Sequence, residues 1–304
     1  MSATFQLPPA LRPGDRVAVV APASGFERGA FEAGLALIRA RYHAEHSGGV
    51  FERERYLAGS DARRLAELTA ALADPGLRAV FCARGGYGAT RLLSRLGTAA
   101  PLGPPKLFVG FSDITALHLW LQAHGRASVH GPVLTQLPRL AAATRERLFD
   151  LLESPYPAPA LNGAATYVSG VAEGPLLGGN LSVLTRMLGT PFMPSLEGAI
   201  LLLEDHGERP YRLDRMWTHL QLAGVFARVR GIALGTFTAC EEQDAAYSSA
   251  DVLRELAAST GLPCAAGFPV GHGDLNEVVP LGVRVRLDAD AARLMFLEAA
   301  VTPY

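Results

Sequence analysis

Three apolar, strand-like segments of the sequence end in side chains that can attack a carbonyl carbon or carry a proton. Ser112 follows the first segment, Glu204 and Asp205 close the second, and His272 comes just after the third. A hydroxyl, a carboxylate and an imidazole that meet in space form the set that serine hydrolases use for nucleophilic attack. Because ligands of open parallel sheets bind beyond the carboxyl ends of the strands, the three positions favour a hydrolase.

The turn at Ser112 has the local pattern of an exposed nucleophile. An apolar strand runs into the serine, Gly110 lies two residues before it, and a helix is expected directly after it. Main-chain N–H groups at such a helix start can stabilise a developing oxyanion. The turn is similar to a nucleophile elbow but lacks its second glycine, since Ile114 occupies that place. The alternative is that Ser112 only caps the helix.

Another strand end carries the glycine-rich stretch 84–88, which reads RGGYG. It matches neither the dinucleotide-binding pattern G-x-G-x-x-G nor a phosphate-binding P-loop. Its glycines allow a main-chain N–H group to approach a substrate closely, and Arg84 can hold a substrate carboxylate. Arg84, Gly85 and Tyr87 are therefore candidate substrate-binding residues. An ordinary turn with an arginine paired on the surface is the alternative.

The strand that ends near Glu204 is followed by several ionisable residues. Alternation along a strand puts Glu204 and Asp205 on opposite faces, so we expect only one of them to point into a given site. With His206 and Glu208, they are also candidate ligands of a hard divalent cation in a metal-dependent hydrolase. No H-E-x-x-H pair supports such a metal site.

Histidines at two strand ends compete for the role of general base. His272 stands between two glycines, which predicts a mobile, accessible ring suited to a base. His130 is the main competitor, whereas His118 lies too far along the helix after Ser112. A buried histidine with a structural role is the alternative for each.

The first half of the chain alternates short apolar strands with helical segments, which predicts β–α–β units and a mostly parallel sheet. Residues 27–41 place apolar side chains at helical spacing, and a second helix is capped by Ser60 or Asp61 and stops at Asp74. The expected strands are 17–21, 78–83, 107–111 and 127–130, and the other expected helices are 89–96 and 113–123.

A proline-rich stretch separates this half from the rest of the chain. Residues 153–165 predict a linker between a first domain at 1–152, which carries Ser112, and a second domain at 166–304. The second domain is expected to contain two or three helices, strands at 171–177, 200–204, 231–237 and 265–270, and a closing hairpin at 283–287 and 293–298. This pattern predicts a mixed α/β domain with some antiparallel pairing.

The composition is that of a folded protein. Of 304 residues, 49% are hydrophobic and 19% are charged, which excludes intrinsic disorder. A net charge of −1 gives no basic excess for nucleic-acid binding, and no apolar run approaches the roughly 20 residues of a membrane helix. The start of the chain lacks the pattern of a secretory signal, so we expect a cytoplasmic protein. Cys82, Cys240 and Cys264 are too sparse for disulfides or structural zinc, and we expect them to be small buried hydrophobes.

Five stretches of the sequence together carry a resemblance to a known family. They read RGGYGATRLL (84–93), GFSDITALH (110–118), LLGGNLSVLTRMLGTP (176–191), LLLEDHGERPYRLDRMWTHL (201–220) and GFPVGHGDLNEVVPLG (267–282). In this order they span most of the chain, which resembles the LD-carboxypeptidases of peptidase family S66. That family also contains microcin C7 immunity-type hydrolases.

The resemblance implies a nucleophile at Ser112, a general base at His272 and a carboxylate at Glu204 that orients the imidazole. It also implies a flavodoxin-like N-terminal domain, a swivelling-type C-terminal domain, a homodimer, and catalysis without a metal or other cofactor. The expected reaction belongs to peptidoglycan recycling. It is hydrolysis of the bond between a diamino acid and the terminal D-alanine of a murein tetrapeptide, with the N–H groups of Asp113 and Gly86 at the oxyanion.

Three other functions stay open on the sequence. Microcin-immunity members hydrolyse peptidyl or aminoacyl nucleotides and use an aromatic residue in a loop to hold the base. Residues 240–250 are a candidate for that loop through Tyr247, but the stretch is short and acidic, which favours the murein peptidase. The others are a metal-dependent hydrolase and a small-molecule binding protein without catalysis. The sequence assigns no role to Arg212.

Overall fold

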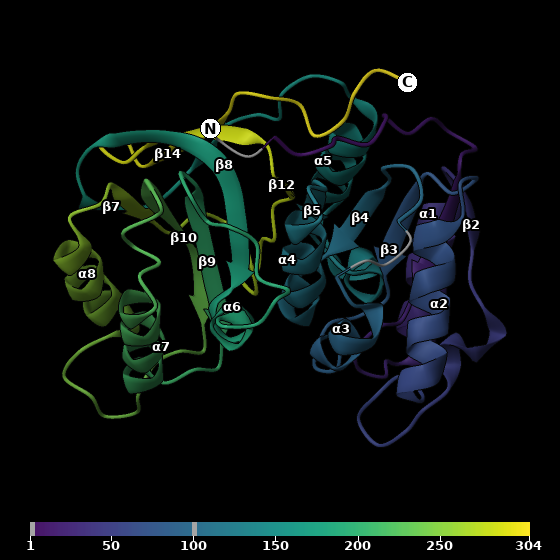
Figure 1. Ribbon diagram of the computed structural model, residues 1–304, viewed down its shortest axis with the longest axis horizontal. Coiled ribbons are helices and arrows are strands. Elements are labelled where there is room, and N and C mark those ends of the chain that lie inside the picture. Colours follow the sequence, from purple (N-terminus) through teal and green to yellow (C-terminus); the bar gives the residue numbers. More distant parts are fainter. Residues whose placement is uncertain (1–3, 99–101) are drawn as a thin grey trace.

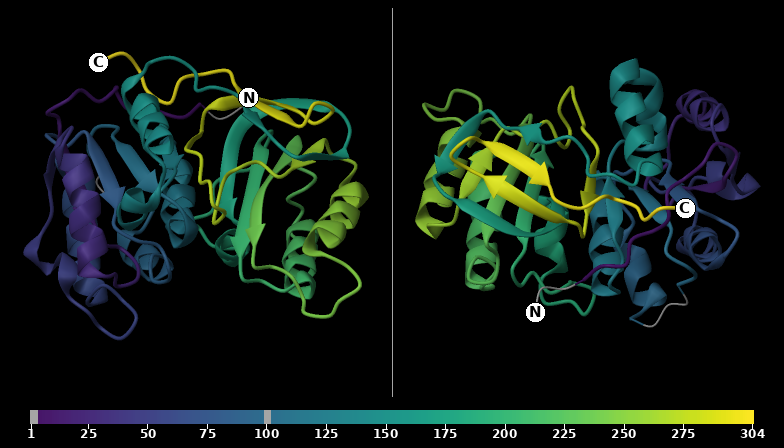
Figure 2. Two further views of the ribbon diagram at one scale, coloured as in Figure 1. Left: turned by 180° about the vertical axis from the view of Figure 1, so that it is seen from behind. Right: turned by 90° about the horizontal axis from the view of Figure 1, so that it is seen from above.

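The chain folds into two α/β lobes that lie side by side, each built on its own sheet (Figure 1). The computed structural model describes residues 4–98 and 102–304. Seen from above, the C-terminal hairpin lies across the second lobe (Figure 2). Within the described residues, no helix has the length and apolar character that crossing a bilayer requires.

The first sheet has six strands in the order β12-β5-β4-β3-β1-β2. They are β1 (Arg16–Val20), β2 (His43–Glu45), β3 (Ala79–Cys82), β4 (Leu107–Gly110), β5 (Ser128–His130) and β12 (Val279–Leu281). Neighbouring strands are parallel except β5 and β12, so the predicted mostly parallel sheet is confirmed. The first five strands have the flavodoxin-like order, in which ligands bind at the carboxyl ends near the β1/β3 switch point.

Helices cover both faces of this sheet because its strands are apolar on both sides. They are α1 (Arg28–Arg39), α2 (Asp61–Ala73), α3 (Thr90–Leu96), α4 (Thr115–Ala123) and α5 (Ala142–Glu153), with the 3₁₀ turns η1 (Gly48–Phe51), η2 (Ser112–Ile114) and η3 (Leu134–Arg139). Along β1, Val20 packs on the side of α2, α3 and α4, whereas Val19 packs on the side of α1 and α5. The predicted cap of α2 is confirmed, since the Ser60 hydroxyl accepts the N–H of Arg63 at 3.2 Å.

The second sheet has eight strands in the order β6-β14-β13-β8-β9-β10-β11-β7. They are β6 (Leu161–Asn162), β7 (Ala165–Val168), β8 (Val171–Asn180), β9 (Ile200–His206), β10 (Gly231–Thr238), β11 (Cys264–Ala266), β13 (Arg284–Asp288) and β14 (Arg293–Phe296). Strands β8 to β11 are parallel and the flanking strands are antiparallel, so the predicted mixed lobe with its closing hairpin is confirmed. One face is covered by α6 (Leu181–Met187), α7 (Pro210–Leu222) and α8 (Ser249–Thr260).

The two lobes share a core where α4 meets β8 and α6. Leu117 of α4 belongs to the same buried apolar cluster as Leu177 and Leu184 of the second lobe. The late strand β12 completes the first sheet by pairing with β5. The division of the chain at residues 153–165 stays a prediction, and that stretch contains the end of α5 and the short strand β6. Apolar packing therefore holds the strand ends of both lobes next to each other.

Most predicted elements differ from the observed ones by a few residues at their ends, and two of these differences have a clear cause in the backbone. The strand expected at 265–270 is the shorter β11, because Gly267 has a φ of +79° and Pro269 has no N–H to donate. The helix expected at 113–123 begins as the 3₁₀ turn η2 and becomes α-helical only at Thr115. Both changes occur next to candidate site residues, where the backbone leaves regular geometry.

The three cysteines, Cys82, Cys240 and Cys264, are free and buried. Removal from water raises the pKa of each thiol. The thiols therefore stay protonated and pack as small hydrophobes, as predicted.

Candidate active site

Ser112 occupies a strained turn at the carboxyl end of β4. Its φ of +65° lies in the left-handed region that residues other than glycine rarely adopt. Gly110 is required two residues earlier, since a Cβ there would lie 2.9 Å from Cγ2 of Ile114. Ser112 caps neither η2 nor α4, so the capping alternative is wrong. Its positive φ between a strand and a helix is a feature that Ser112 shares with the nucleophile elbow of other hydrolases.

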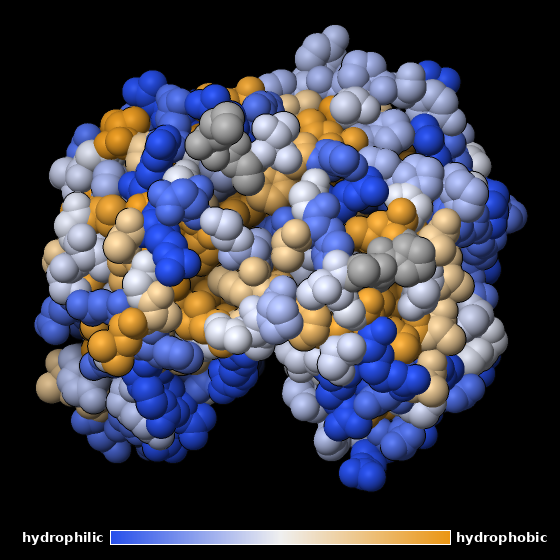
Figure 3. Space-filling model, in the orientation of Figure 1, coloured by the Kyte–Doolittle hydropathy of each residue, from blue (hydrophilic) through white to orange (hydrophobic). Residues whose placement is uncertain are grey.

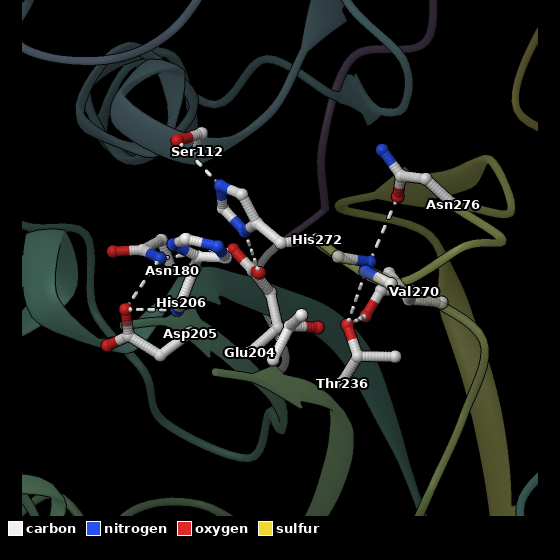
Figure 4. A network of polar contacts seen from close by, with 12 residues as sticks. Ser112, Asn180, Glu204, Asp205, His206, Thr236, Val270, His272 and Asn276 are labelled. Carbon is white, nitrogen blue, oxygen red and sulfur yellow. Dashed lines mark hydrogen bonds and ion pairs between the residues drawn. The ribbon is translucent and has the colours of Figure 1, made fainter. Parts of the chain in front are cut away.

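Ser112, His272 and Glu204 form a continuous hydrogen-bonded chain across the two lobes (Figure 4). The serine hydroxyl lies 3.0 Å from Nε2 of His272, and Nδ1 lies 2.7 Å from Oε2 of Glu204. With Nδ1 protonated, the imidazole donates to the carboxylate, and Nε2 accepts the serine proton. The Glu204 side chain is fully buried, whereas that of His272 is 20% exposed. The carboxylate therefore lies behind the ring, away from solvent.

The loop that carries His272 is fixed by packing and hydrogen bonding. Gly273 donates its N–H to Oγ1 of Thr236 at 3.1 Å. Gly271 has a φ of +119°, and a Cβ there would lie 2.5 Å from Oε2 of Glu204. The structure thus gives the two glycines a packing role, where the sequence suggested mobility of the ring.

Asn180 connects the two adjacent carboxylates of β9, and our sequence analysis did not single it out. Its Nδ2 donates to Oε1 of Glu204 at 3.2 Å and to Oδ1 of Asp205 at 3.1 Å. Alternation along β9 sends the two carboxylates in different directions (Figure 4), yet one amide reaches both. Burial raises the pKa of Asp205. The Ser182 hydroxyl opposes this shift because it donates a hydrogen bond to the ionised carboxylate. The sequence signal for Asn180 was its capping position before α6.

A main-chain contact ties the lobes together beside this network. The N–H of Asn180 donates to Oγ1 of Thr115 at 3.0 Å. Gly179 has a φ of +137°, and a Cβ there would lie 2.6 Å from the same hydroxyl oxygen. The contact therefore joins the start of α4, which follows the Ser112 turn, to the end of β8, which pairs with β9 at Glu204.

The glycine-rich loop after β3 packs directly against the Ser112 turn. A Cβ on Gly85 would lie 2.9 Å from Cβ of Ser112, and Gly86 has a φ of +95°. The Asp113 carboxylate holds the loop by accepting the N–H of Ala89 at 2.8 Å. Burial raises the pKa of Asp113 to about 6, although the N–H donors of the loop stabilise the carboxylate and partly oppose this shift. Main-chain groups of the loop and the turn thus lie together beside the serine hydroxyl.

A cavity of about 700 Å³ opens between the lobes at these strand ends. Its lining includes Ser112, Asp113, His272, Asp205 and the predicted substrate-binding and oxyanion residues Arg84, Gly85, Gly86 and Tyr87. Glu204 is not part of the lining, so one of the two adjacent carboxylates faces the cavity, as alternation predicts. The space-filling view shows a notch between the lobes at the lower edge, flanked mainly by hydrophilic side chains (Figure 3). The volume falls within the roughly 300–1,000 Å³ of small-molecule sites.

Comparison with known proteins identifies the family. Residues 17–131 match the LD-carboxypeptidase N-terminal domain, and residues 173–287 match the LD-carboxypeptidase C-terminal domain. The chain belongs to the LD-carboxypeptidase family. It is 37% identical to the murein tetrapeptide carboxypeptidase of Pseudomonas aeruginosa, over 91% of this chain and 94% of that protein.

Two solved structures share the fold over almost the whole length of this LD-carboxypeptidase family member. The muramoyltetrapeptide carboxypeptidase from Oxalobacter formigenes is 30% identical with a TM-score of 0.84, over 95% of this chain and 100% of that chain. MccF in complex with glutamyl sulfamoyl guanosine has a TM-score of 0.88 over 97% of this chain and 99% of that chain. Its identity is 24%, so this second likeness concerns the fold alone. The family and fold class expected from the sequence are confirmed.

The competing histidines lie away from the cavity in this family member. His130 is fully buried, and neither ring nitrogen has a hydrogen-bond partner among the described residues. Burial lowers the pKa of His130 well below its usual range. His118 is also buried, and its Nε2 lies 2.8 Å from the carbonyl oxygen of Gly110. His272 is therefore the histidine that reaches Ser112.

Of the residues named for the other functions, Asp205, His206 and Glu208 line the cavity, whereas Tyr247 and Arg212 do not. Within residues 4–98 and 102–304, no group of three or more His, Cys, Asp or Glu side chains is placed to hold a metal ion. Tyr247 is 51% exposed and does not line the cavity. Arg212 does not line it either and belongs to an adjoining groove.

Proposed function

We propose that the protein is a serine LD-carboxypeptidase that releases the terminal D-alanine of murein tetrapeptide during peptidoglycan recycling. The observation that carries this proposal is the hydrogen-bonded chain from Ser112 through His272 to Glu204 at the edge of the cavity. The Pseudomonas aeruginosa and Oxalobacter formigenes proteins, named for murein tetrapeptide and muramoyltetrapeptide, support the substrate class.

In the first half of the reaction, the Ser112 hydroxyl attacks the carbonyl carbon of the diamino acid, and its proton passes to Nε2 of His272. The carbonyl oxygen becomes an oxyanion beside the N–H groups of Asp113 and Gly86. Glu204 stabilises the imidazolium through Nδ1. The C–N bond then breaks as His272 returns the proton to the leaving nitrogen, and D-alanine departs from an acyl-serine.

In the second half, water attacks the carbonyl carbon of the acyl-serine while Nε2 of His272 takes its proton. The oxyanion forms again beside the same N–H groups. Its collapse breaks the ester, and His272 returns the proton to Ser112 as the shortened peptide leaves. Each oxyanion donor typically contributes about 100- to 1,000-fold in turnover, so the geometry of the glycine-rich loop matters in both halves.

A carboxypeptidase also has to recognise the free carboxylate of the residue that leaves. Arg84 lines the cavity, and its guanidinium is anchored by donating to the carbonyl oxygen of Gly25 at 2.7 Å. The remaining N–H groups of this fork can bind a carboxylate through charge-assisted hydrogen bonds. We assign Arg84 to the carboxylate of the departing D-alanine.

Mass spectrometry of murein tetrapeptide incubated with the protein tests this function. The expected result is loss of one alanine, identified as the D enantiomer by chiral chromatography, with full activity after dialysis against EDTA. Activity that is lost to EDTA and restored by a divalent cation would overturn the proposal in favour of a metal-dependent hydrolase. Cleavage of an aminoacyl nucleotide without release of D-alanine would instead identify an immunity-type hydrolase. Cleavage of neither substrate would point to a binding protein.

A further inference from the structure

A second hollow adjoins the catalytic cavity on the side of the second lobe. It has a volume of about 410 Å³ and lies between α6 and α7. Arg186 and Glu208 line both the cavity and this hollow, so the two spaces share a wall. Arg212, Arg215 and His219 line the far side. We call this hollow the basic groove.

The spacing of the residues on α7 makes the groove basic. Arg212, Arg215 and His219 follow one another at intervals of three and four residues, which places them on one face of the helix. Glu208 is the acidic residue of the lining, and it lies 3.4 Å from the guanidinium of Arg212. Arg186 forms no ion pair with a carboxylate in the part of the chain that the structure describes, and the same holds for Arg215.

The same arginines also act on Tyr211, which lies next to them on α7. The pKa of the exposed Tyr211 hydroxyl is lowered, first by a hydrogen bond from Arg212 and then by the positive charges of Arg212, Arg209 and Arg215. The guanidinium groups of Arg212 and Arg215 each lie 5.8 Å from the Tyr211 ring. Because three arginines and one carboxylate line the groove itself, a negatively charged group that enters it meets a net positive charge.

The geometry of a carboxypeptidase reaction indicates which end of the substrate can reach this groove. Only one amino acid lies on the leaving side of the scissile bond, and Arg84 is available for its carboxylate. The rest of the peptide lies on the acyl side and has to run from Ser112 along the cleft. A groove that shares a wall with the catalytic cavity is accessible to that longer part.

We infer that the basic groove is a subsite for a free carboxylate on the acyl side of the peptide. In a murein peptide this is the α-carboxylate that remains free on the γ-linked glutamate preceding the diamino acid. The inference rests on the proposed function and deepens it. Arg186 and Arg215 bind the carboxylate, and Glu208 holds Arg212 in place at the groove. A single carboxylate suits a groove that contains both arginines and Glu208 better than a diphosphate does, because Glu208 would repel the larger negative charge of the diphosphate.

Binding measurements on the Ser112→Ala protein test the subsite without turnover. Two tetrapeptides are compared by calorimetry, one with the γ-linked glutamate and one with isoglutamine, in which an amide replaces the free carboxylate. We expect the glutamate peptide to bind about 3- to 10-fold more tightly. Adding Arg215→Gln or Arg186→Gln reduces this ratio towards one. Arg228→Gln, an exposed change outside both spaces, is the matched control and keeps the ratio.

Three results would overturn the inference, and the first two concern the ratio of the two affinities. One is a ratio near one in the Ser112→Ala protein, and the other is a ratio that neither Arg215→Gln nor Arg186→Gln reduces. Uridine diphosphate is the probe for a phosphate site, and competition by it that depends on Arg215 would contradict the carboxylate assignment. Release of D-alanine by the wild-type protein is measured separately. Loss of D-alanine release would count against the proposed function, whereas the binding ratio reports on the subsite alone.

Discussion

The two lobes contribute different kinds of groups to the cleft. The first lobe supplies a hydroxyl and main-chain N–H groups placed by unusual backbone conformations, with φ of +65° at Ser112 and +95° at Gly86. The second lobe supplies Glu204 and His272, which are placed by burial and side-chain hydrogen bonds. Neither lobe holds a complete site. Activity should therefore depend both on the charge of Glu204 and on the shape of the junction that brings the two lobes together.

Removing the charge of Glu204 should reduce activity far more than removing the charge of its neighbour Asp205. Glu204→Gln keeps the shape of the side chain but removes the anion that accepts the hydrogen bond from Nδ1 of His272 and, in the proposed reaction, stabilises the charged imidazole. We expect kcat for D-alanine release to fall about 1,000- to 10,000-fold. Asp205→Asn is the matched control, because Asp205 is adjacent and shares Asn180 but does not contact His272. We expect it to lose about tenfold or less, and equal losses in both variants would contradict the assigned role of Glu204.

The junction between the lobes should respond to a change of shape without a change of charge. Gly179→Ala places a methyl group against Thr115 and separates α4 from the end of β8. A displacement of about 1 Å costs on the order of 100-fold in a proximity-dependent reaction, so we expect a loss of that size in kcat/KM. Gly189→Ala is the control, because Gly189 has a φ of +76° and nothing within 4 Å of its added Cβ. The account fails here if both variants, still folded by circular dichroism, have the same activity.

The buried carboxyl of Asp113, in the first lobe, should make the stability of the protein depend on pH in the acid range. Burial raises the pKa of Asp113 to about 6, so between about pH 4 and pH 6 the folded state binds a proton that the unfolded state lacks. Stability from this group is therefore present at low pH and is lost as the pH rises to about 6, on the order of 3 kcal/mol.

Urea unfolding at a series of pH values measures this effect. The free energy of unfolding of the wild type, minus that of Asp113→Asn, should decrease between pH 4 and pH 6 and stay constant above. The exposed change Asp150→Asn serves as the control, and a pH-independent difference for Asp113→Asn would refute the assignment.

Local patterns were sufficient to predict the elements that carry the site. β3, β4 and α2 have compact apolar signals and clear ends, and Ser60 caps α2 as its position indicated. The turn at Ser112 was visible because Gly110 and the following helix are adjacent in the sequence. Family resemblance then selected Glu204 over Asp205, which alternation alone could not do.

The features that the sequence did not predict depend on contacts between distant residues. β12 is three residues long, and its pairing with β5 joins Val279 to His130. Asn180 looks like an ordinary helix cap until β9 brings Glu204 and Asp205 to its amide. No local pattern records such contacts, because they form only when the sheets are assembled.

The central claim is that the hydroxyl of Ser112 is the nucleophile. Kinetics of the Ser112→Ala protein with murein tetrapeptide test this claim most directly. The account predicts that D-alanine release falls about 10,000-fold or more, while calorimetry still detects binding of the intact peptide. Release of D-alanine within about tenfold of the wild-type rate would contradict the account, because a protein without this hydroxyl cannot form the acyl-serine.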